Sequence, residues 1–144
     1  MAGNAEAART DFQAALRVVN DRLATEPNRV SLLVHRAAIL IELGDRAAAE
    51  PLIREIRQRV NAGNSTDSRD VGVGVRVVDV AQLLAQMGEH EGALAALESM
   101  RQAEISTLTW LAHLRVNLRY DPVWDPLRGN PRFEALLKLS ELKK

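Results

Sequence analysis

The sequence predicts an all-α protein, in which antiparallel helical hairpins form a superhelix that a C-terminal segment closes. Three observations lead to this class. Apolar residues recur at intervals of three and four along most of the chain, which is the period of an amphipathic helix. Glycines at positions 44 and 88 separate helical segments by short turns. The segments around the first glycine are repeated around the second.

The first expected helix covers residues 5–26. Its apolar residues recur at helical spacing, and it ends before Pro27, because a proline disfavours helical geometry in the residue before it. The apolar positions of this helix are Ala8, Phe12, Ala15, Leu16, Val19 and Leu23.

The first hairpin is expected at residues 30–61. Gly44 ends its first helix, and Asp45 is placed to cap the second helix. Pro51 stands several residues inside that second helix. A delayed start or a kink is therefore expected there, since proline lacks the backbone N–H of a helical residue.

A linker rich in Asn, Ser and Asp is expected at residues 62–69, and the second hairpin follows at residues 70–102. The stretch VGVGVRVV alternates as a strand would. A helix from about Asp70 is nevertheless preferred, because a lone strand would have no pairing partner elsewhere in the sequence. Gly88 forms the turn of this second hairpin.

The two hairpins align when Gly44 is placed on Gly88. Small residues then match small residues and large ones match large ones. Alanines at matched positions predict close contacts between the helices of each hairpin. The matched pairs are Leu33 with Val77, Ala37 with Ala81, Leu40 with Leu84, Ala49 with Ala93, Ile53 with Leu97 and Ile56 with Met100.

This spacing resembles the tetratricopeptide repeat, a helical hairpin that stacks into α-α superhelices. The aromatic residues of that pattern are replaced here, and Arg36 occupies an apolar position of it. Ala8, Phe12 and Ala15 resemble the second helix of such a repeat. The resemblance therefore implies a single tetratricopeptide-like domain over residues 1–144 that begins in mid-repeat.

The ending DPVWDPLRGNPRFEALL, residues 121–137, makes the resemblance more specific. It matches the pattern DPxWDPLRxxPRFxxLL. Similar tails close bacterial serine/threonine protein kinases, class III nucleotide cyclases and winged-helix regulators. The resemblance implies that the chain is the C-terminal part of a larger signalling or regulatory protein, with capping helices at residues 105–142.

A helical solenoid exposes its last apolar face unless a cap covers it. Trp124 and Phe133 can cover that face, and Pro126 restricts the path of the chain between them. Asn130 is placed to cap a last helix that begins at Pro131. We therefore interpret this segment as a structural cap, and the alternative is an aromatic patch that binds a partner.

Composition and motifs exclude several functions. The chain has 19 basic and 19 acidic residues, which argues against nucleic-acid binding. No apolar run is long enough for membrane insertion. There is no cysteine, which excludes disulfides, thiolate catalysis and cysteine-ligated metals. The three histidines are scattered, and no arrangement of catalytic groups, metal ligands or cofactor-binding residues is found. We therefore expect no catalytic, metal or cofactor site in this chain.

The function expected from the sequence is non-catalytic protein–protein interaction or scaffolding. The candidate binding groove lies on the first helices of the hairpins and includes His35, Asp79 and Gln82. The expected partner is a protein, a peptide or the remainder of the same polypeptide. Two alternatives remain: a homodimer formed through the helix at residues 5–26, and the tail of a kinase or cyclase whose catalytic domain lies upstream. A cytoplasmic location is expected, or an extracytoplasmic one if the full protein has a transmembrane helix upstream.

Overall fold

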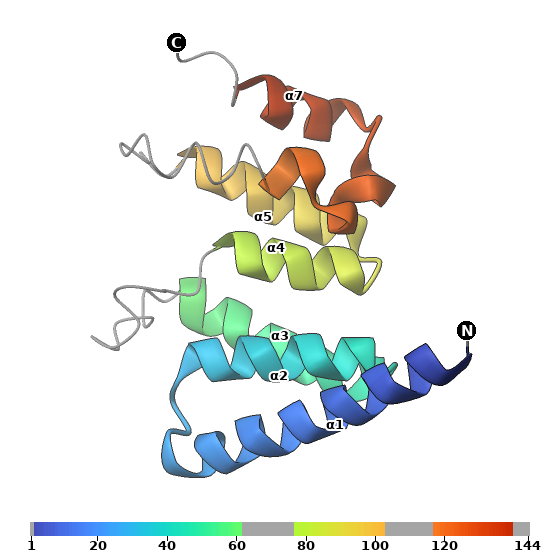
Figure 1. Ribbon diagram of the computed structural model, residues 1–144. Coiled ribbons are helices and arrows are strands. Elements are labelled where there is room, and N and C mark those ends of the chain that lie inside the picture. Colours follow the sequence, from blue (N-terminus) through green and yellow to red (C-terminus); the bar gives the residue numbers. More distant parts are fainter. Residues whose placement is uncertain (1, 62–76, 103–116, 140–144) are drawn as a thin grey trace.

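The computed structural model describes residues 2–61, 77–102 and 117–139. These residues are helical and contain no strand, so the predicted all-α class is confirmed for them (Figure 1). A helical turn at residues 117–120 leads into a 3₁₀ helix, η1. The elements are α1 (Ala2–Thr25), α2 (Val30–Glu42), α3 (Arg46–Asn61), α4 (Val77–Gln86), α5 (His90–Gln102), η1 (Pro122–Leu127) and α7 (Pro131–Leu139).

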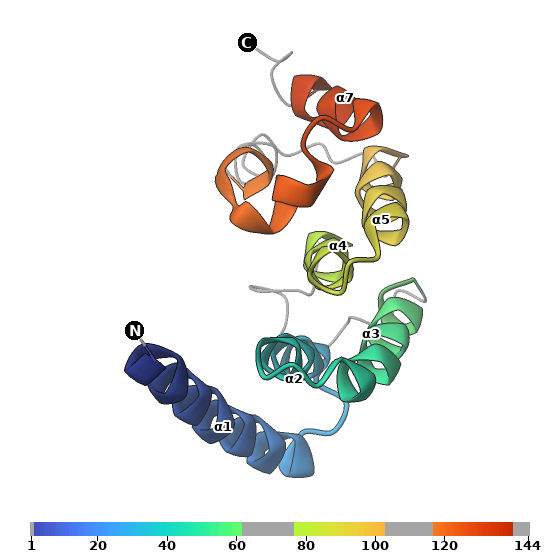
Figure 2. The same cartoon turned by 90° about the vertical axis from the view of Figure 1, so that its right-hand side faces the viewer.

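Two antiparallel hairpins form the middle of the molecule. Helix α2 packs along α3, helix α4 packs along α5, and α4 also contacts both helices of the first hairpin. Helix α1 packs on α2 at one end of the stack, while η1 packs on α4 and α7 packs on α5 at the other end. Figure 2 shows α3 and α5 on one side of the stack and α2 and α4 on the other.

The turn at Gly44 explains why glycine ends the first helix of the hairpin. Gly44 has a φ of +82°, a left-handed conformation that costs a residue with a side chain about 1–2 kcal/mol. The N–H of Asp45 donates to the carbonyl of Leu40 (2.8 Å), and the N–H of Gly44 donates to the carbonyl of Ile41 (2.9 Å). This pair of bonds satisfies the last carbonyls of α2. The Asp45 carboxylate then accepts from the N–H of Ala48 (3.1 Å), as predicted for the cap of α3.

The second turn repeats the first. Gly88 has a φ of +80°. Its backbone bonds run from Glu89 N–H to the Leu84 carbonyl (2.9 Å) and from Gly88 N–H to the Ala85 carbonyl (3.0 Å). Each donor and acceptor lies 44 positions after its counterpart in the first turn, so the sequence alignment of the hairpins holds at the level of backbone geometry.

A third turn of related geometry, which the alignment did not include, precedes α7. Gly129 has a φ of +83°, close to the other two glycines. Asn130 follows it and caps α7, because its side-chain oxygen accepts from the N–H of Arg132 (2.9 Å). Pro131 is the first residue of α7, as the sequence predicts. The element before this turn is the 3₁₀ helix η1 rather than an α-helix.

The core lies between the helices of the two hairpins and continues to the C-terminal segment. Ala37 and Ala81 are fully buried, as the alignment predicts, and so are Ala49 and Ala93. Alanine at these four positions lets neighbouring helices approach closely. Larger side chains fill the space beside them: Leu33, Leu40, Ile53, Ile56, Leu84, Leu94 and Leu97 are all buried.

Two sequence expectations differ from the structure or lie beyond it. Helix α3 begins at Arg46, so the delayed start expected from Pro51 is wrong. Proline has no backbone N–H, so Pro51 leaves the carbonyl of Ala47 without its helical hydrogen bond. Pro51 and Ala47 are both exposed, so water can take the place of that bond. The linker at 62–69, the beginning of the second hairpin at 70–76, and residues 105–116 and 140–142 of the capping region lie outside the described residues.

Candidate functional site

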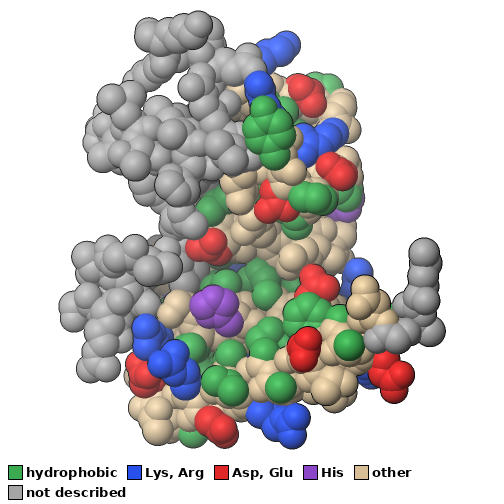
Figure 3. Space-filling model, in the orientation of Figure 1, with side chains coloured by type: hydrophobic (Ala, Val, Ile, Leu, Met, Phe, Trp, Pro, Cys, Tyr) green, Lys and Arg blue, Asp and Glu red, His purple; other side chains and the backbone are tan. Residues whose placement is uncertain are grey.

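The three predicted groove residues lie on α2 and α4, the first helices of the two hairpins. His35 is exposed near the middle of α2, whereas Asp79 is half-buried in the first turn of α4. These two residues are 44 positions apart, so they occupy the same position in the two hairpins. Figure 3 shows this face of the molecule, with a histidine side chain (purple) over α2 and hydrophobic side chains (green) gathered over α1 and α2.

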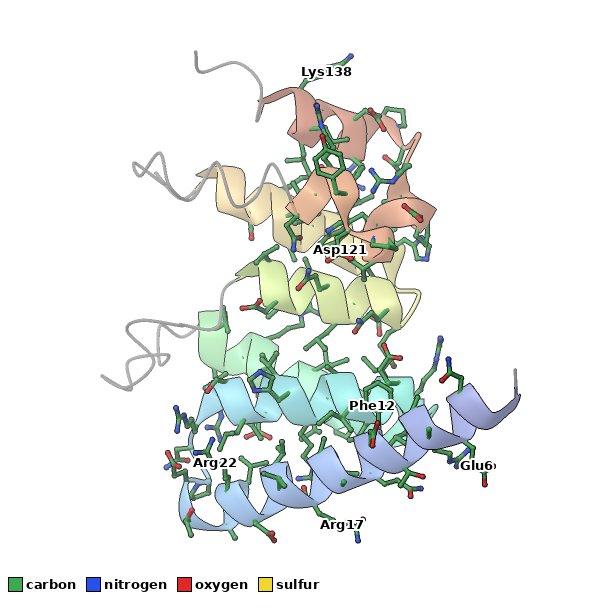
Figure 4. All side chains as sticks on the ribbon, in the orientation of Figure 1. Glu6, Phe12, Arg17, Arg22, Asp121 and Lys138 are labelled. Atoms are coloured by element: carbon green, nitrogen blue, oxygen red, sulfur yellow. The ribbon has the colours of Figure 1, made fainter. Side chains whose placement is uncertain are left out.

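Gln82, the third predicted groove residue, is half-buried, and its side chain bonds to residues of the C-terminal segment. Its Nε2 donates to Oδ1 of Asn117 and to Oδ2 of Asp121, both at 3.3 Å. Figure 4 shows Asp121 beside α4, in agreement with these bonds. Gln82 therefore joins α4 to the C-terminal segment, and a partner would have to replace these bonds in order to use its amide.

Asn117 lies at the centre of this arrangement, and the sequence reasoning did not single it out. Its Oδ1 also accepts from the indole Nε1 of Trp124 (3.0 Å). Asp121 has a second role, because its Oδ1 accepts from the N–H of Val123 (3.0 Å) and caps η1. We call Gln82, Asn117, Asp121 and Trp124 the polar hub. The hub fixes the start of η1 against α4.

The C-terminal segment buries both of its predicted aromatic residues. Trp124 and Phe133 are each fully buried, and their ring centroids lie 6.1 Å apart with an interplanar angle of 31°. This is the tilted, offset geometry that aromatic pairs prefer over a face-to-face stack. Leu118 is buried in the same core cluster.

Pro126 does not contribute to that buried surface. It is exposed within η1, and the buried side chains of that helix are Trp124 and Leu127. Leu127 belongs to the matched ending at residues 121–137, but the sequence reasoning gave it no role in the cap. Pro126 is limited to restricting the backbone path.

An ion-pair cluster holds α7 on α5. The guanidinium of Arg132 donates to both carboxylate oxygens of Glu98 (2.8 and 2.7 Å) and to Glu91 (2.6 Å). The hydrogen bonds that Arg132 donates to Glu98, and then the one that it donates to Glu91, raise the pKa of Arg132 above its ordinary value. The two-pronged contact with Glu98 fixes the orientation of the guanidinium plane as well as its position. Arg132 therefore sets the register of α7 along α5.

A second long-range contact joins the two hairpins. The guanidinium of Arg46, at the start of α3, donates to the carbonyls of Met87 (3.2 Å) and Gln86 (3.5 Å) at the end of α4. These carbonyls belong to the last turn of α4, where helix geometry leaves acceptors unpaired and a positive charge is favourable. The contact aligns the second hairpin on the first.

Within residues 2–61, 77–102 and 117–139, no group of three or more histidine, aspartate or glutamate side chains could hold a metal ion. In the same ranges, no helix combines the length and apolar character needed to cross a membrane.

No family model, curated protein or solved structure matches this chain.

Proposed function

We propose that this chain is a non-catalytic protein–protein interaction or scaffolding module with tetratricopeptide-like hairpins. The observation that carries the proposal is the repeated hairpin, with equivalent turns at Gly44 and Gly88 and equivalent buried alanines. Stacked hairpins of this kind present a continuous surface from equivalent helices, and such surfaces serve protein binding in repeat proteins.

The proposed binding surface is the solvent side of α2 and the beginning of α4. His35 is exposed there and can donate or accept a hydrogen bond. Val34, Ala38 and Ile41 are partly buried hydrophobic residues on the same helix. An exposed polar group beside apolar side chains suits a protein or peptide partner, which needs apolar contact for affinity and polar contact for orientation.

The C-terminal segment is proposed to act as a structural cap and not as a recognition element. Trp124 and Phe133 have no surface to offer a partner, because both are fully buried. Both residues also belong to the ending at residues 121–137, which resembles the tails of bacterial signalling proteins. We therefore propose that the chain serves in a larger signalling or regulatory protein, where its partner is another protein or the remainder of its own polypeptide.

The test is proximity crosslinking followed by mass spectrometry, with full-length protein and variants of the proposed surface. We expect His35→Glu and Ala38→Glu to lose the crosslinked partner, and we expect His35→Glu, at an exposed position, to retain the wild-type unfolding temperature. The matched control is Gln58→Glu, an exposed position on α3. A partner that crosslinks equally to all three variants would place the binding surface elsewhere, and a partner that requires Trp124 alone would reverse the assignment of the cap.

A further inference from the structure

Helix α1 has an unusual position among the described helices, because it is covered on one side only. None of its residues from 4 to 25 is buried. Leu16 and Leu23 pack against the core cluster, and α2 is the helix that α1 contacts most closely. Figures 1 and 2 show α1 at one end of the stack of helices, so a large part of its surface faces away from the rest of the molecule.

A second stripe runs along α1, in which Asp11, Val18 and Arg22 are exposed and Ala15 is half-buried. Asp11, Ala15, Val18 and Arg22 are spaced by four, three and four residues, which places them on one face of a helix. At about 100° per residue, this face is rotated by about 120° from the line of Leu16 and Leu23 that meets α2. We call these four residues the α1 seam.

The seam combines apolar exposure with unpaired charges. Val18 is 60% exposed, and it and Tyr120 are the exposed large hydrophobic residues among those described. Asp11 and Arg22 are exposed and form no ion pair with another described residue. The seam therefore has an acidic end, an apolar centre and a basic end.

This order of charges is complementary to itself in one orientation. If a second copy of α1 lies antiparallel on the first, with the two-fold axis between residues 16 and 17, Asp11 faces Arg22 of the second copy. Arg22 then faces Asp11 of the second copy, and Ala15 faces Val18 in both halves of the contact. A parallel pairing would instead place Asp11 against Asp11 and Arg22 against Arg22, which is repulsive.

We propose that the α1 seam is a homodimer interface, in which two copies of this chain pair through antiparallel α1 helices. The small side chain of Ala15 lets the helix axes approach within about 8–10 Å, so that Val18 of each copy is covered. This surface lies on α1 and is independent of the partner surface proposed on α2. One helix pair buries less than the ~1,200 Å² of a standard stable interface, so dissociation is expected at concentrations of about 0.01–1 mM.

Sedimentation equilibrium over a concentration series tests the proposal through a charge-swap cycle. Asp11→Arg and Arg22→Asp each place like charges at both ends of the seam, and each should weaken the dimer about tenfold. The double variant Asp11→Arg/Arg22→Asp restores opposite charges and should recover the wild-type dissociation constant. Val18→Lys should give a monomer with unchanged helical content, since Val18 is exposed in the single chain.

The matched control is Arg17→Asp, which lies on another face of α1 and points away from α2 (Figure 4). It makes the same change of charge as Arg22→Asp, and it should leave the dissociation constant unchanged. A wild-type chain that stays monomeric up to millimolar concentration overturns the proposal. A double variant as weak as either single variant overturns the antiparallel register, and an equal effect of Arg17→Asp shows that net charge and not the seam controls association.

Discussion

Replacement of Trp124 by alanine is the most direct test of the role of the C-terminal segment. The side chain of Trp124 is fully buried and stands 6.1 Å from the ring of Phe133. Its removal leaves a cavity beside Phe133 and takes the indole donor away from Asn117. Substitution of a buried Trp or Phe by alanine costs about 3–5 kcal/mol. A domain of this size is stable by about 5–15 kcal/mol, so Trp124→Ala should fold with a much lower midpoint.

The assay is urea unfolding followed by far-ultraviolet circular dichroism, which gives the free energy of unfolding. Tyr120→Ala is the control, because Tyr120 is 71% exposed and its loss should change stability by no more than about 0.5 kcal/mol. If Trp124→Ala were destabilised by less than about 1 kcal/mol, Trp124 would not be a core residue and the cap would have no energetic basis.

Two further predictions concern the repeat and the polar hub. Ala37→Leu and Ala81→Leu should each lower the free energy of unfolding by about 1–3 kcal/mol, since both alanines are fully buried at helix contacts. Ala95→Leu, at an exposed position, is the control. If all three variants had the same free energy of unfolding, the alignment of the hairpins would be contradicted. Asn117→Ala should cost about 1–3 kcal/mol, because it leaves the buried indole N–H of Trp124 without its acceptor. In a Trp124→Phe background, which lacks the indole donor, Asn117→Ala should cost less in calorimetry, and an equal loss in both backgrounds would rule out the indole bond as the cause.

Local features of this chain were determined by the sequence alone. The class, the positions of the hairpin turns and the burial of Ala37 and Ala81 follow from patterns within about ten residues. A glycine that ends a helix adopts left-handed geometry at low cost, and helical periodicity assigns small residues to one face. Gly44, Gly88 and Asp45 therefore take the conformations and bonds that their neighbours in sequence imply.

The C-terminal segment was predictable in part. Its aromatic residues and Asn130 stand out in an alanine- and leucine-rich chain, and a solenoid end requires apolar cover. The burial of Leu127 was not predicted, because it depends on the direction in which η1 turns its side chains. The 3₁₀ geometry of η1 turns Leu127 toward the core and leaves Pro126 in solvent.

Contacts between distant residues were decided by the tertiary structure alone. Gln82 bonds to Asn117, 35 residues later, and Arg132 bonds to Glu91, 41 residues earlier. Any of several asparagines or glutamates could have filled these roles, since a hydrogen-bonding side chain carries no mark of its partner in the local sequence. The path of the backbone brings one particular pair within bonding distance, and for this reason the side chain of Gln82, a candidate groove residue, bonds to the C-terminal segment.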